Sequence, residues 1–182
     1  MTKIKVNKIE AAQRQIDTAI RLLFDNEDPV AIHTLTMAGF RILRDLAHKH
    51  NSNMNRVVKS RIKPGMEGKF WGTMQSFANF LKHADKDPDG IIDDIQEEVN
   101  DAILFLTTIY YRDLGYQFTP EMLALHGWFS VIHPDVLREY SPDNFQHQLN
   151  AASIYLVGKP RNEQLAQGKE VLNIARVFFS SQ

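Results

Sequence analysis

Apolar residues recur at intervals of three and four along most of the chain, the spacing typical of amphipathic helices. No segment of useful length shows the strict alternation typical of a β-strand. The spacing predicts about seven helices, over residues 5–24, 29–49, 67–84, 91–114, 120–133, 142–156 and 161–179. We therefore expect an all-α protein, an antiparallel helical bundle with a C-terminal helical extension.

Proline, glycine and small polar residues mark the ends of several predicted helices. Asp28 before Pro29 and Thr119 before Pro120 combine an N-cap residue with proline at the first helical position. Gly115 suits the C′ position after the helix over 91–114. Residues 50–66 are polar and irregular, so we expect a loop there with only a short turn at Val57 and Val58.

The order of the predicted helices suggests two parts. Residues 1–115 would form a four-helix core, and residues 116–182 would form a helical segment packed on that core. The helix over 91–114 should be among the most buried elements. Its expected core face contains Ile95, Val99, Ala102 and Leu106, which are spaced for one side of a helix.

Composition excludes several classes of protein. The chain has 182 residues and no cysteine, which excludes disulfides, thiolate zinc sites and iron–sulfur clusters. The formal net charge of −1 is not that of a protein that binds polyanions through its overall charge. The polar N-terminus lacks a signal-peptide core, and no apolar run approaches the length that spans a bilayer. We expect a soluble cytoplasmic protein with no membrane partner and no cofactor.

Charge is unevenly distributed along the chain. Five basic residues and no acid lie between positions 46 and 66, and eight acids with one base lie between 85 and 101. The acids suit a helix N-terminus, where they complement the helix dipole. The basic stretch is either a solvated loop or a surface for a phosphate-bearing partner.

The chain has no glycine-rich phosphate loop and no HExxH, GxSxG or EF-hand pattern, so histidines carry the candidate chemistry. Asn79 and His83 are four residues apart and should share a face near the end of one helix, beside Lys82. His83 could act as acid or base, Asn79 could orient it, and Lys82 could bind phosphate. The alternative is that His83 and Lys82 only stabilise the C-terminal end of their helix.

A second candidate group lies beside the apolar stripe of the helix over 29–49. His33, Met37, Arg41, Arg44 and His48 follow one another at steps of four, four, three and four. Arg41, Arg44 and His48 could bind a phosphate group, whereas His33 could instead be a core histidine. The alternative for the arginines is that their stems only cover apolar surface.

A metal site is the third candidate. Carboxylates at Asp94, Glu97, Glu98 and Asp101 could in principle hold Mg²⁺ in a helical bundle. A second acidic helix is missing, so we predict no metal ligands.

The order of elements resembles the HEPN superfamily of small α-helical bundles. Residues 11–17 and 28–35 are similar to the opening helix pair of that family, and residues 79–83 are similar to its region of arginine, polar residue and histidine. The resemblance covers about residues 5–114 and implies a homodimer that binds RNA and, in active members, cleaves it without metal. It implies that His83 is the histidine and Asn79 the polar residue. The family's arginine should fall on Ala78 and is absent, which favours binding over cleavage.

Three functions therefore compete. The first is a HEPN-like protein that binds RNA or a nucleotide, the second is a dimeric protein-interaction module without catalytic activity, and the third is a metal-dependent nucleotide hydrolase. Whether the chain is an enzyme is left open by the sequence.

Overall fold

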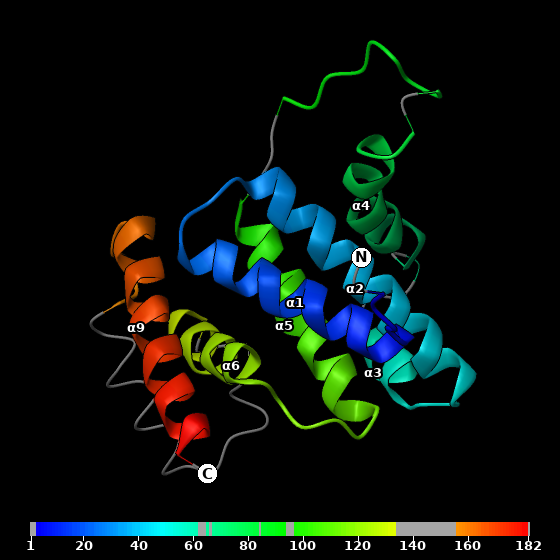
Figure 1. Cartoon of the computed structure of the whole chain (residues 1–182). Helices are drawn as coiled ribbons and strands as arrows, with labels where there is room; N and C mark the ends of the chain where they lie inside the picture. Colours follow the sequence, from blue (N-terminus) through cyan, green and yellow to red (C-terminus); the bar gives the residue numbers. More distant parts are fainter. Residues whose placement is uncertain are drawn as a thin grey trace. The chain divides into compact units, whose positions relative to one another are not determined.

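The computed structural model describes residues 3–61, 65, 67–83, 85–93, 97–133 and 156–181. Within these ranges the chain is helical and contains no strand, which confirms the predicted all-α fold (Figure 1). The helix predicted over residues 142–156 lies outside the described ranges except for its last residue. The described part contains seven helices: α1 (Lys8–Phe24), α2 (Pro29–Lys49), α3 (Met54–Arg61), α4 (Glu67–Phe80), α5 (Glu97–Asp113), α6 (Pro120–Ile132) and α9 (Arg161–Ser180).

The chain divides into two compact units. The first comprises residues 1–19 and 29–117, and the second comprises residues 20–28 and 118–182. Helix α1 therefore contributes its first part to one unit and its last part to the other. That residues 116–182 pack on the first four helices stays a prediction.

The core of the first unit forms where α2 meets α1 and α5. Gly39 of α2 lies against α1, and a Cβ atom added there would stand 3.0 Å from Ile16 Cγ1 and 3.4 Å from the Ala12 carbonyl oxygen. A glycine at this position therefore permits the close approach of the two helices. Phe40 of α2 and Tyr110 of α5 meet edge to face, with ring centroids 5.6 Å apart, and both are fully buried.

Helix α5 buries a different face from the one that the sequence predicts. Val99 is 40% exposed and Ala102 is exposed, whereas Leu104 is completely buried. The helix also begins at Glu97, and residues 91–93 lie outside it. The predicted face is wrong because four polar residues of α5 occupy core positions and displace the apolar pattern: Asn100, Asp101, Thr107 and Thr108.

The predicted loop over residues 50–66 contains the short helix α3 instead. Met54 and Val58, one turn apart, are its buried residues. Ser52 Oγ accepts a hydrogen bond from the Met54 amide at 2.9 Å and donates one to the carboxylate of Asp113. Asn55 Oδ1 accepts a hydrogen bond from the Tyr110 hydroxyl at 2.8 Å. These contacts hold α3 against α5, and the sequence pattern misses them because only two apolar residues face the core.

The second unit is built around α6 and α9, which pack together. Thr119 caps α6 as predicted, and its hydroxyl accepts from the Met122 amide at 3.2 Å. The buried indole of Trp128 donates to the Gln164 carbonyl oxygen at 2.7 Å and meets Phe24 edge to face.

Helix α9 begins after Pro160, also as predicted. Its last turns expose apolar side chains at Ile174, Val177, Phe178 and Phe179. None of the helices in the described residues is long and apolar enough to cross a membrane.

Candidate phosphate-binding site

Arg41 and Asn79 are in direct contact, although the sequence places them in two separate groups of candidate site residues. Arg41 Nη2 on α2 donates a hydrogen bond to Asn79 Oδ1 on α4 at 2.8 Å. Both residues belong to the first unit. The bond occupies the amide oxygen of Asn79 and leaves its NH₂ group as a donor at an exposed position.

Lys82 is the second cation at this position. It lies in the turn after α4, and its backbone amide donates to the Asn79 carbonyl oxygen at 3.1 Å. Burial and, after it, the positive charge of Arg41 lower the pKa of Lys82. In the part of the chain that the structure describes, neither Arg41 nor Lys82 forms an ion pair with a carboxylate. Two neighbouring cations and an amide donor therefore form one surface, which we call the Arg41–Lys82 site.

His83 does not share a helical face with Asn79, because α4 ends at Phe80 rather than continuing to residue 84. Its Nδ1 lies 3.9 Å from Asp85 Oδ1 in an exposed pair. The inference that placed the two side chains together on one helix is therefore wrong. A catalytic role for His83 stays a prediction.

Arg44 and His48 continue along α2 away from the Arg41–Asn79 contact. Arg44 bonds to Asp45 through Nε at 3.3 Å and Nη2 at 3.1 Å, and its guanidinium carbon lies 5.9 Å from the centre of the Phe40 ring. Asp45 offsets its charge, which makes Arg44 a weaker phosphate ligand than Arg41. His48 is exposed in the last turn of α2. The structure records no contact that joins either residue to Asn79.

His33 is a buried histidine, 3% exposed, which agrees with the core position that the sequence analysis gives as the alternative for it. Its Nδ1 lies 2.8 Å from Asn100 Oδ1, and Asn100 Nδ2 donates to the Pro29 carbonyl oxygen at 3.1 Å. Because the second bond uses the NH₂ group of Asn100, its oxygen accepts and His33 carries the proton on Nδ1. The sequence pattern does not single out Asn100, which lies in the acid-rich stretch between residues 85 and 101.

Three influences act on the pKa of His33. Burial is the largest and lowers it, the hydrogen bond to Asn100 raises it, and the positive charge of Lys82 lowers it. The result is a lowered pKa, so the imidazole is neutral near pH 7. The Phe77 ring of α4 covers it, with centroids 4.5 Å apart.

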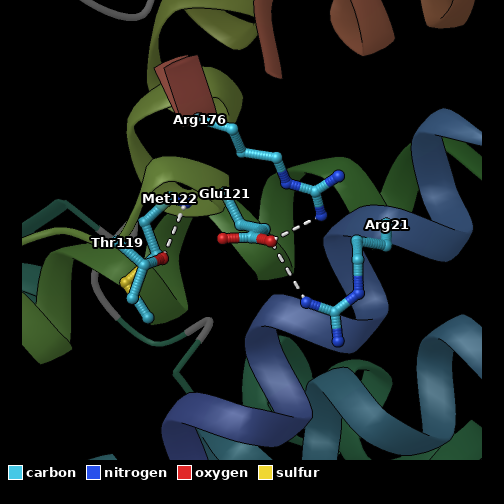
Figure 2. A network of polar contacts seen from close by, with 5 residues as sticks. All are labelled: Arg21, Thr119, Glu121, Met122 and Arg176. Atoms are coloured by element: carbon cyan, nitrogen blue, oxygen red, sulfur yellow. Dashed lines mark hydrogen bonds and ion pairs between the residues drawn. The ribbon is translucent and has the colours of Figure 1, made fainter. Parts of the chain in front are cut away.

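In the described part of the second unit, two arginines bind one carboxylate (Figure 2). Glu121 Oε1 accepts from Arg176 Nη2 at 2.7 Å and from Arg21 Nη1 at 3.1 Å. Burial acts to raise the pKa of Glu121, but the hydrogen bonds and charges of the arginines outweigh it and lower the pKa. The sequence could not reveal this group because its members are 55 and 100 residues apart. Through these ion pairs, Glu121 connects α6 with α9 and with the last part of α1.

The structure does not assemble the carboxylates that were considered for a metal. Glu97 and Glu98 are exposed, whereas Asp101 is 1% exposed and lies on the buried side of α5. Asp94 lies outside the described residues. Among the described residues no group of three or more histidine, aspartate or glutamate side chains could hold a metal ion.

The chain was compared with protein-family models, with curated proteins and with solved structures, and none of the three comparisons gives a match. The geometry of the chain itself is therefore the basis on which its function is inferred.

Proposed function

We propose that this protein binds RNA, and that the Arg41–Lys82 site contacts the phosphate groups of the RNA. The observation that carries the proposal is the hydrogen bond from Arg41 to Asn79 beside Lys82. The bond fixes the guanidinium of Arg41, whose charge lowers the pKa of Lys82. Among the described residues neither cation has a carboxylate partner.

Electrostatics explains why such a site would bind a phosphate group. Two like charges close together at a protein surface repel, and a bound phosphate removes that repulsion while accepting charge-assisted hydrogen bonds. The guanidinium of Arg41 and the NH₂ group of Asn79 supply directed donors, and Lys82 supplies a point charge. The net charge of −1 means that this attraction is local rather than a property of the whole chain.

The exposed basic residues around α3 support the choice of a polymeric ligand. Lys49, Arg56 and Lys59 are exposed in the same unit. They could contact further phosphates of a chain, whereas a single nucleotide would not need them. This is the observation that favours RNA over a free nucleotide.

A binding measurement with matched variants tests the proposal. We expect the double variant Arg41→Gln with Lys82→Gln to bind a single-stranded RNA oligonucleotide at least tenfold more weakly than wild type, by fluorescence anisotropy. The control is Arg14→Gln with Lys8→Gln, which removes the same charge from exposed positions of α1 in the same unit. Equal loss in the two double variants would mean that overall charge, not this site, binds RNA.

Cleavage is not part of this proposal. The position of the family's arginine is Ala78, which is 1% exposed, so an arginine side chain would not fit there without rearrangement. Incubating RNA without metal, with wild type and with His83→Ala, decides the point. Cleavage by wild type alone would assign His83 a catalytic role.

The homodimer that the resemblance implies and the cytoplasmic location remain part of the proposal. Sedimentation velocity over a range of concentrations measures the first, and cell fractionation the second.

A further inference from the structure

Among the described residues, the buried Nε2 atom of His33 has no hydrogen-bond partner. An unsatisfied buried group of this kind makes folding less favourable. Such atoms are uncommon in folded proteins, and one that persists calls for an explanation, such as a bound water or a ligand.

The neighbours of His33 hold this atom in one chemical state. The Pro29 carbonyl oxygen orients Asn100, and Asn100 Oδ1 keeps the proton of the imidazole on Nδ1. Nε2 therefore presents a lone pair and acts as an acceptor. An imidazole oriented by an amide at one nitrogen is arranged to accept a proton or a hydrogen bond at the other.

Lys82 and helix α4 connect the same histidine with the Arg41–Lys82 site. The positive charge of Lys82 lowers the pKa of His33, and the positive charge of Arg41 lowers the pKa of Lys82. Helix α4 carries both Phe77, which covers the imidazole, and Asn79, which binds Arg41. A ligand held by these cations would reach the buried imidazole only after the half-buried Phe77 side chain moved aside, so the inference requires that movement.

We propose that His33 recognises RNA, with Nε2 accepting a hydrogen bond from a ribose 2′-hydroxyl next to the phosphate that binds Arg41 and Lys82. The inference rests on the proposed function and adds selectivity to it. DNA offers the same phosphates but no donor at the 2′ position.

The test compares ribo- and 2′-deoxyribo-oligonucleotides of one sequence. We expect wild type to bind the ribo-oligonucleotide about three to ten times more tightly, which is the effect of one net hydrogen bond. His33→Phe keeps a ring beside Phe77 but removes the acceptor, so it should bind both oligonucleotides with the affinity that wild type has for the deoxy form. The control His50→Phe changes an exposed histidine of the same unit and should keep the preference.

The outcomes separate the two proposals. If neither oligonucleotide binds wild type, the proposed function fails. If both bind equally, or if His33→Phe keeps the preference for RNA, only the role of His33 is overturned.

A second measurement does not depend on the folding of a variant. Long-range ¹H–¹⁵N spectra of wild type report the state of each imidazole nitrogen. We expect the His33 Nε2 resonance to shift on addition of the ribo-oligonucleotide and not of the deoxy form. A resonance that stays unchanged with both oligonucleotides would show that no ribose hydroxyl reaches the nitrogen, which overturns the inference.

Discussion

Burial keeps two histidines of this protein neutral, in different surroundings. His33 bonds to Asn100 in the first unit, whereas His126 contacts Phe118 in the second, with ring centroids 4.4 Å apart and the ring planes tilted by 39°. Burial lowers the pKa of His126 to about 4. A histidine whose pKa is lower when folded than when unfolded makes the folded state less stable in acid.

The sign of the effect gives a prediction for His126. Between its ordinary value near 6.5 and the folded value near 4, only the unfolded state binds the proton, so stability falls as the pH falls. We expect wild type to lose about 1–2 kcal/mol more than His126→Leu between pH 7 and pH 5, in urea unfolding. His50→Leu, at an exposed position, serves as the control and should lose as much as wild type. Identical losses in wild type and His126→Leu would show that the imidazole is not neutral when buried.

At the scale of elements, helix ends were predicted well where the sequence contains a strong local signal. Helices α2, α6 and α9 begin at or after prolines, as predicted, and Gly115 follows α5 with a φ angle of 90°. Helix α4 lacks such a signal near its end and stops four residues early. As a consequence, His83 lies beyond the end of α4 and is not on the helical face that carries Asn79.

The buried face of α5 yields a prediction at this scale. Val99 lies in the first turn and is 40% exposed, where an added carboxylate meets the favourable end of the helix dipole. We expect Val99→Asp to change the free energy of unfolding by less than about 0.5 kcal/mol. Leu104→Asp should cost several kcal/mol or prevent folding, because it buries an unpaired charge at a completely buried position. Denaturant unfolding of both variants measures the two changes in the free energy of unfolding. A larger loss in Val99→Asp than in Leu104→Asp would support the buried face that the sequence predicts.

At the scale of the whole molecule, near-neutral net charge limits how RNA can bind. The two cations of the proposed site contribute about −1.4 to the slope of the logarithm of the binding constant against the logarithm of salt concentration, and each basic residue around α3 that contacts a phosphate adds about −0.7. Arg41→Gln should make the slope shallower by about 0.7, because one phosphate contact is lost. Titrations at several salt concentrations measure both slopes. A wild-type slope no steeper than about −1.4 would place no phosphate on the basic residues around α3, and an unchanged slope in Arg41→Gln would place none on Arg41.

The sequence by itself determined the fold class and most helix positions. Apolar spacing, prolines and glycines act within a few residues of one another, so their effects are readable along the chain. The sequence also indicated the participants of the candidate site, since Arg41, Asn79 and Lys82 were selected by residue type and spacing.

Only the tertiary structure decided which of these residues meet and which face of each helix is buried. Arg41 bonds to Asn79 across 38 positions, and His33 bonds to Asn100 across 67. No local pattern encodes such contacts, because they depend on how whole helices pack. The polar residues in the core of α5 are tolerated for the same reason: hydrogen bonds such as that of Asn100 to Pro29 satisfy them, and those partners exist only in the folded chain.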